Sequence, residues 1–238
     1  MRSLIQSLVI SVLLTFCVTM ADACCGYDYQ KEDLSGYNLQ PDLKLTNNPA
    51  FDTDYSRNGH AVYVYGGGLF THYFFLDSNI TAYAGSSTLN YNPSATYQSN
   101  YYGFHLGVAK ELSRYFDAQL MYLQTLTQNR TNGGISLSYR NMDIILDAAW
   151  ILNPNSQCQI SLQGGGALTE ATSTLTANGN SYSPPQSLTE INPEIGGGVA
   201  FFMTSSWAIR LSTLYIADLS KVNSNGNLNV LLGLSYVV

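Results

Sequence analysis

Apolar and polar residues alternate along most of the chain from residue 60 onward. In Tyr102–Leu112, for example, the large apolar side chains fall on even positions, while the odd positions hold Gly, His, Ala and Glu. A period of two predicts β-strands with one apolar and one polar face. Eight such segments are His60–Leu76, Tyr102–Leu112, Phe116–Thr125, Met142–Leu152, Gln157–Gly164, Asn192–Phe201, Trp207–Tyr215 and Asn227–Val238.

Two segments depart from this pattern. His60–Leu76 is apolar at both odd and even positions, so its inward face stays undetermined. Ile135–Tyr139 has its apolar residues at odd positions, whereas the following residues have them at even positions from Met142. This change of phase predicts either a β-bulge near Arg140–Asn141 or a strand that begins after it.

The connections between the predicted strands alternate between short and long. Short ones follow the second, fourth and sixth strands, at Leu112–Tyr115, Asn153–Ser156 and Met203–Ser205. Long polar ones follow the first, third, fifth and seventh strands, at Asp77–Asn100, Gln128–Gly133, Thr169–Glu190 and Leu219–Asn225. This arrangement is typical of an up-and-down barrel with periplasmic turns and extracellular loops. An even number of strands places both ends of the barrel on the periplasmic side.

The composition favours a membrane barrel over a soluble protein. Only 11% of the residues are charged, against about 25% in ordinary globular domains. After residue 20 the chain has no apolar run of the length that a membrane helix needs. Together these features predict an all-β fold, an eight-stranded antiparallel up-and-down transmembrane β-barrel over 59–238. The net charge of −6 and the lack of a Lys/Arg cluster exclude nucleic acid as a partner.

The first residues predict export. Arg2 precedes an apolar segment, Leu4–Val18, and Ala21-Asp22-Ala23 is a small-x-small cleavage site, so 1–23 is predicted to be a signal peptide. An uncleaved anchor and a lipid-modified Cys24 are the alternatives. Residues 24–58 lack a clear period and are predicted to form an irregular periplasmic extension. The pairing of Cys24, Cys25 and Cys158 stays open.

The segment from Ala61 to Val238 resembles the OmpA-like family of eight-stranded outer-membrane barrels. The alternation of Val230, Leu232, Leu234, Tyr236 and Val238 resembles the terminal signature read by the barrel-insertion machinery, although that family ends on Phe or Trp. The resemblance implies an outer-membrane location, contact with membrane lipids and with the insertion machinery, and loops that face the cell surface. No peptidoglycan-binding domain follows the last strand, so cell-wall anchoring is not implied.

Several charged residues fall on the predicted inward faces of the strands. They are Glu111, Asp117, Asp143, Asp147, Glu194 and Arg210. Because a buried isolated charge is costly, we expect Arg210 to pair with Glu194 or with a carboxylate across the lumen. The cluster is interpreted as a satisfied polar core. The alternative is a gate that switches a narrow conduction path, a behaviour found in the resembled family.

Other candidate chemistry is weak. If the first loop closes near residues 76 and 101, His72 and His105 face each other across the first hairpin. No matched Ser and carboxylate accompany them, so packed or hydrated histidines are expected. No metal, cofactor or phosphate-binding spacing is present. Aromatic residues near strand ends are predicted to form membrane-interface girdles. They are Tyr63, Tyr73, Phe75, Tyr101, Tyr102, Trp150, Trp207 and Tyr236.

The sequence leaves four classes of function to compare. The leading hypothesis is a non-enzymatic outer-membrane barrel that is structural or contacts host or neighbouring surface proteins through four extracellular loops. A narrow pore is the alternative. A lipid-modifying barrel enzyme and a soluble lipocalin-like carrier are the third and fourth classes. The outward Phe, Leu, Ile, Val and Tyr residues argue against the soluble carrier, because a carrier would expose charged residues there.

Overall fold

The computed structural model describes residues 60–132, 134–183, 190–220 and 223–238. The predicted signal peptide (1–23) and periplasmic extension (24–58), with Cys24 and Cys25, lie outside the described residues. In the described part, no helix has the length and hydropathy to cross a bilayer. The elements in chain order are β1 (Val62–Phe75), β2 (Ile80–Ala84), β3 (Ser87–Tyr91), α2 (Pro93–Thr96), β4 (Asn100–Glu111), β5 (Phe116–Thr125), β6 (Gln128–Asn132), β7 (Ile135–Ile151), β8 (Cys158–Ala177), β9 (Asn180–Tyr182), β10 (Glu190–Phe202), β11 (Trp207–Ala217) and β12 (Ser224–Val237).

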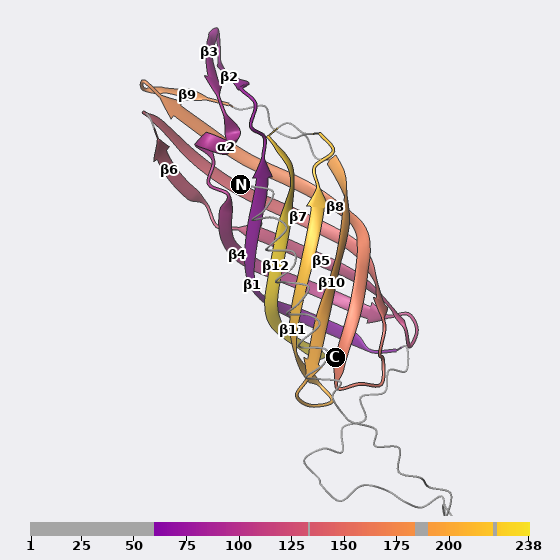
Figure 1. Ribbon diagram of the computed structural model, residues 1–238. Helices are drawn as coiled ribbons and strands as arrows, with labels where there is room; N and C mark the ends of the chain where they lie inside the picture. The colour runs from indigo at the N-terminus through magenta and orange to yellow at the C-terminus, as the bar shows by residue number, and fades with distance from the viewer. Residues whose placement is uncertain (1–59, 133, 184–189, 221–222) are drawn as a thin grey trace, which may run out of the picture.

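Eight long strands close into a barrel (Figure 1). β1, β4, β5, β7, β8, β10, β11 and β12 each pair antiparallel with the next strand, and β12 pairs with β1 to complete the circle. The predicted eight-stranded up-and-down antiparallel barrel is therefore confirmed. Closure leaves the eight strands without an unpaired edge, which a membrane-spanning sheet requires.

The two ends of the barrel differ. At one end, named here the turn end, short turns join β4 to β5, β7 to β8 and β10 to β11. The first and last strands also meet there, since the Val238 amide donates to the Val62 carbonyl. At the other end, named the loop end, the longer connections carry β2, β3, α2, β6 and β9 (Figure 1). The predicted alternation of short and long connections is confirmed.

The loop end has more strand than the sequence pattern predicted. Gln128–Asn132, expected in a loop, is strand β6 and pairs with the first residues of β7. β8 continues to Ala177, deep into the expected loop Thr169–Glu190, and β9 folds back onto it. Alternation of large apolar residues stops before these segments, so the pattern used to predict strands could not detect them.

The strand faces follow the expected alternation. Outward positions carry exposed apolar residues such as Leu106, Leu120, Leu146, Leu162 and Leu232, which form a belt around the barrel. The undetermined strand β1 places its odd residues inward, because Tyr63, Tyr65 and Leu69 are buried whereas Val64 is exposed. A side-chain-filled lumen inside an apolar belt is the arrangement of a small membrane barrel.

The predicted bulge is absent from β7. β7 pairs with β8 in unbroken register from Ile135↔Ala177 to Ile151↔Ser161, and its odd residues face inward throughout. The irregularity lies on the neighbouring strand: Gln124 pairs with Met142 but Gln128 pairs with Tyr139, so four steps on one strand match three on the other. The change of phase in β7 therefore reflects a change in what surrounds the strand.

Buried apolar residues form two separate cores. One lies within the barrel and includes Tyr65, Met121, Ile145 and Leu214. In this core the Tyr65 ring packs against Gly107, where an added Cβ would come within 2.4 Å of the ring. The second core gathers residues from the loop end, including Tyr73, Tyr97 and Tyr139. The loop end therefore has a hydrophobic interior of its own, which loose surface loops lack.

Candidate functional site

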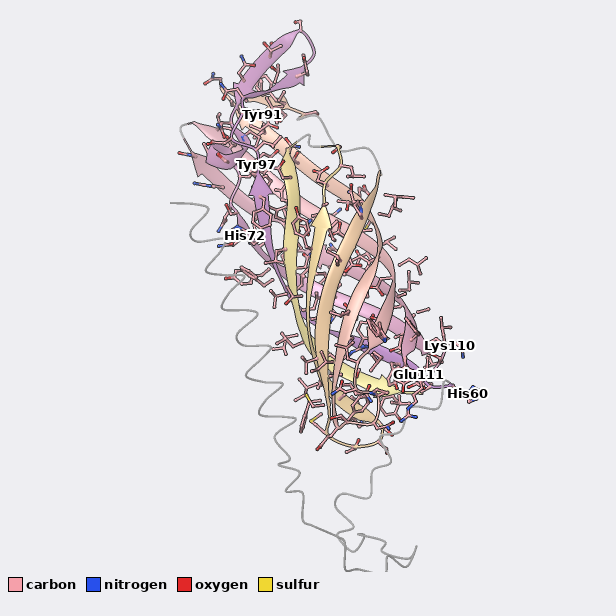
Figure 2. The ribbon with its side chains drawn as sticks, turned by 45° about the vertical axis from the view of Figure 1, so that its right-hand side comes forward. His60, His72, Tyr91, Tyr97, Lys110 and Glu111 are labelled. Carbon is pink, nitrogen blue, oxygen red and sulfur yellow. The ribbon has the colours of Figure 1, made fainter. Side chains whose placement is uncertain are left out.

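The predicted charge cluster lies inside the lumen. Glu111, Asp117, Asp143, Asp147 and Glu194 are all buried, and Arg210 is partly buried among them. Near the turn end, the Tyr63 hydroxyl donates to the Glu111 carboxylate. Figure 2 shows Glu111 at this end, beside Lys110 and His60. These five carboxylates share the lumen with the guanidinium of Arg210.

Arg210 stacks on an aromatic ring. Its guanidinium carbon lies 4.6 Å from the centroid of the Tyr65 ring, a favourable cation–π geometry. Arg210 pairs in register with Ala200, whereas Glu194 pairs with Ile216. Six residues of strand separate Ala200 from Glu194, or about 20 Å at the rise of a β-strand. This separation rules out the expected Arg210–Glu194 pair.

The carboxylates that face Arg210 belong to strands across the lumen. The charge of Arg210 acts on Asp147 of β7, and Asp117 of β5 lines the same cavity as Arg210. That cavity has a volume of about 20 Å³, which is room for about one water molecule. Of the two partners expected for Arg210, the carboxylates across the lumen therefore lie near it, whereas Glu194 does not.

Asp147 and Glu194 flank a glycine. Both residues pair with Gly165 of β8, one from each side, which places their Cα atoms about 10 Å apart. Within the described residues, neither carboxylate has a hydrogen-bond partner for either oxygen, and Arg210 Nη1 also has none. Asp143 is better satisfied, because Asn141 Nδ2 donates to its Oδ2 at 2.8 Å. The lumen is thus polar and incompletely paired.

The two histidines do not face each other, contrary to expectation. His105 points inward, is 3% exposed and shares a hydrogen bond with the Gly68 carbonyl at 3.2 Å. His72 lies outward near the loop end, where its Nδ1 is 2.7 Å from Asn100 Oδ1 (Figure 2). The pleat of neighbouring strands places them on opposite sides of the sheet. They cannot share one catalytic or metal site.

The predicted aromatic girdles are partly wrong. Trp150, Trp207, Tyr236 and Tyr102 do point outward, and the Trp207 and Tyr236 rings lie 4.8 Å apart at the turn end. Tyr63, Tyr73 and Tyr101 are buried inside instead. The nearness of a residue to a strand end predicts its height in the membrane. Whether its side chain points inward or outward depends instead on which alternate positions of that strand, odd or even, face the lumen.

Five rings close the lumen at the loop end. They belong to Tyr73, Phe75, Tyr97, Tyr101 and Tyr139, and are named here the aromatic cap. Tyr139 contacts Tyr97 at 5.3 Å, Tyr101 at 5.0 Å and Tyr73 at 5.6 Å between centroids. Phe75 stacks on Tyr97 at 4.8 Å. Edge-to-face and stacked contacts of this kind add to the free energy gained by burying the rings.

The short helix α2 covers the cap. Asn92 caps its first turn, and Pro93 follows at the first helical position. Two side chains of β6 hold this segment from the other side: Arg130 Nη1 donates to the Tyr97 carbonyl at 2.9 Å and Asn132 Nδ2 donates to the Ala95 carbonyl at 3.2 Å. Side chains on the inward face of β6 therefore hold the α2 segment against the loop end of the barrel.

Tyr91 and Tyr97 anchor the connection from β3 to α2 (Figure 2). The Tyr91 hydroxyl donates to Asn223 Oδ1 at 2.9 Å and so joins the first loop to the last. Tyr97 is 1% exposed, and its hydroxyl has no hydrogen-bond partner among the described residues. Burial raises the pKa of both tyrosines above the usual value. Both rings are thus held neutral in the loop-end core.

A cavity of about 30 Å³ lies beneath the cap, with room for about two water molecules. Tyr73, Phe75 and Tyr139 of the cap form part of its wall, and Asn141, Asn192 and Asn227 line it as well. Asp218 and Asn223 of the β11–β12 connection complete its wall at the loop end, so this cavity lies between the aromatic cap and the last loop.

The loop-end strands form one continuous sheet. β6, β7, β8 and β9 are neighbours in order, and a bridge between Ser183 and Tyr83 links β9 to the β2–β3 hairpin. In Figure 1 these elements rise together beyond the other strands of the barrel. On the inner face of this sheet, Leu137, Leu175 and Tyr182 are buried in the same core as the aromatic cap.

The polarity of β7 and β8 inverts at one level. Below it, outward positions such as Ile144 and Leu168 are apolar; above it, they become Arg140 and Thr172. The inward side chains change polarity in the opposite sense: Asp143 is charged, whereas residues farther above it belong to the hydrophobic loop-end core. The sequence signal for this boundary is the odd phase of Ile135–Tyr139. The two predicted explanations, a bulge and a strand that begins after it, are both wrong, because β7 begins at Ile135 and runs in unbroken register.

A closed eight-stranded barrel with an apolar outer belt, a polar lumen and loops at one end defines the outer-membrane β-barrel class of fold. The chain is similar in structure to Ail, the attachment invasion locus protein of Yersinia pestis, with a TM-score of 0.51, 15% identity, and 75% of this chain and 99% of that one covered. It is also similar to the outer membrane protein OprG of Pseudomonas aeruginosa, with a TM-score of 0.51, 9% identity, and coverage of 77% and 98%. No protein-family model and no curated protein sequence matches the chain.

Proposed function

We propose that this protein is a non-enzymatic outer-membrane barrel whose loop end faces the outside of the cell and acts as a contact surface. The observation that carries the proposal is the loop-end sheet, which extends beyond the apolar belt and has its own core. Ordering the loop-end sheet costs conformational entropy, and the barrel can close without this sheet. A structured projection suits recognition of a surface partner, such as a host or neighbouring protein.

The proposed orientation rests on the difference between the short connections of the turn end and the long connections of the loop end. Outer-membrane barrels have short periplasmic turns and long extracellular loops, so the turn end, with both barrel termini, is proposed to be periplasmic. The outward alternation of β12, from Leu228 to Tyr236, suits contact with the barrel-insertion machinery. Two proteins of similar fold are an attachment invasion locus protein and an outer membrane protein, which agrees with a surface location.

Cysteine labelling on intact cells tests the orientation. Thr88→Cys on the β2–β3 hairpin should react with a membrane-impermeant maleimide, whereas Asn155→Cys in the β7–β8 turn should react only after the outer membrane is opened. Both positions are exposed. The parent chain measures background from the natural cysteines. Labelling of Asn155→Cys alone on intact cells would overturn the proposal.

A narrow pore is the second candidate, and the incompletely paired lumen favours it. The aromatic cap and the small cavities oppose it. Planar-bilayer recording separates the two: a contact protein gives no stable openings, while discrete openings of the full chain would support the pore. The barrel-enzyme hypothesis loses its main support, because His72 and His105 lie on opposite faces.

A further inference from the structure

The outer face of the loop-end sheet carries a regular array of hydroxyl groups. Its members are Thr131 of β6, Ser136 and Ser138 of β7, and Thr172, Thr174 and Thr176 of β8, named here the hydroxyl face. Each is at least partly exposed. The face has no acidic or basic member, and Arg140 adjoins its lower margin.

The strand register orders these hydroxyls into rows. Thr131, Ser136 and Thr176 form one row across three strands, and Ser138 and Thr174 form the next. Rows lie about 7 Å apart along the strands, with neighbours about 5 Å apart within a row. Threonine has few χ1 rotamers, so its hydroxyls are held in place before any ligand arrives. Such a grid suits a ligand with many closely spaced hydroxyl groups.

The hydroxyl face continues the lipid-facing belt. Ile144 and Leu168 form the last apolar row, Met142 and Glu170 the boundary row, and Arg140 and Thr172 the first row above it. These residues lie on the same side of the same two strands. The molecules that contact the belt with their acyl chains therefore place their head groups against the hydroxyl face.

The height of the face selects among lipid head groups. Six residues separate Met142 from Ser136, which is about 20 Å along the strand and about 15 Å along the membrane normal at a tilt near 40°. The phospholipid head-group layer is only about 5–8 Å thick on each side. A phospholipid would reach the lower rows alone, whereas a head group of several sugars would reach them all.

We propose that the hydroxyl face and Arg140 bind the phosphorylated glycolipid of the outer leaflet. Sugar hydroxyls exchange hydrogen bonds with the Ser and Thr rows, and the Arg140 guanidinium pairs with a phosphate at the boundary. Glu170, diagonal to Arg140 on the next strand, opposes the phosphate. The proposal rests on the proposed orientation, because that glycolipid is found in the outer leaflet.

Binding is tested by titrating deep-rough lipopolysaccharide in mixed micelles into the detergent-solubilised full chain, with phosphatidylglycerol as the comparison lipid. The lipopolysaccharide should bind at least tenfold more tightly. The triple variant Thr172→Ala, Thr174→Ala, Thr176→Ala should lose about tenfold in affinity, and Arg140→Gln several-fold. Glu170→Gln should gain affinity, which a purely structural role would not produce.

Two controls make the outcome decisive. The variant Ser87→Ala, Thr88→Ala removes exposed hydroxyls from the β2–β3 hairpin, away from the belt, and should bind as the parent does. The shift in gel mobility on heating verifies that each variant folds. Equal affinity for both lipids, or unchanged affinity in the triple variant, would overturn the proposal. Since micelles have no sidedness, this failure is distinct from a wrong orientation, which cysteine labelling reports.

Discussion

The lower and upper parts of β7 and β8 are built on one pleat but are opposite in content. In the lower part, Leu146 and Leu162 face outward while Asp147 and Gln163 face inward. In the upper part, Ser138 and Thr174 face outward while Tyr139 and Leu175 face inward. The alternation is uninterrupted, and only the surroundings change, from lipid outside to water outside. A period of two therefore reveals that a strand has two sides, while the polarity of each side depends on the medium.

The largest effect should come from emptying the centre of the aromatic cap. Tyr139→Ala removes the ring that contacts the four other rings of the cap, and should lower the free energy of unfolding of the loop end by about 3–5 kcal/mol. Limited proteolysis of the loop end measures this. Tyr83→Ala, at a 58% exposed side chain, should change it by less than about 0.5 kcal/mol. Equal sensitivity of the two variants would refute a separate upper core.

A charge placed on the outer face should distinguish the two media directly. Leu146→Arg faces lipid at the middle of the belt, and should cost about 2–4 kcal/mol, whereas Ser138→Arg faces water or head groups and should cost little. Both sites lie on the same face of β7. Urea titration of the folded protein in lipid vesicles gives the two free energies. Similar costs would mean that the boundary at Met142–Glu170 is misplaced.

A smaller effect is expected from alkaline pH on the upper part alone. Burial raises the pKa of Tyr91 and Tyr97, so folding favours their neutral forms. Their stabilisation is complete below the ordinary pKa of about 10, and then falls by up to about 1.4 kcal/mol per buried tyrosine for each pH unit. Tyrosinate absorbance should therefore rise late and together with loop-end proteolysis. Ionisation of all tyrosines near pH 10 in the intact protein would contradict this burial.

The sequence was sufficient for the barrel because alternation is local. Within a segment such as Tyr102–Leu112, the alternation alone shows which side chains point outward. Eight such segments, joined by alternating short and long connections, are enough to predict a closed barrel. The site required information that is not local. Arg210 and Glu194 share the lumen, but their heights depend on the register of β10 and β11. Ile135–Tyr139 was misinterpreted because the same residues suit a core above the membrane as well as a slipped strand.

The pairing of β1 with β12 also bears on how the barrel assembles. The β7–β8 hairpin joins residues close in sequence, whereas the seam between β1 and β12 joins Tyr63 to Val237, at the two ends of the barrel sequence. Because loop closure costs more entropy for longer loops, we expect the hairpin to form early and the seam last. Mutations at Leu232 in the seam should then change the unfolding rate, and mutations at Leu162 the folding rate. Pairing of β1 with β12 is accordingly the step that closes the barrel and ends its folding.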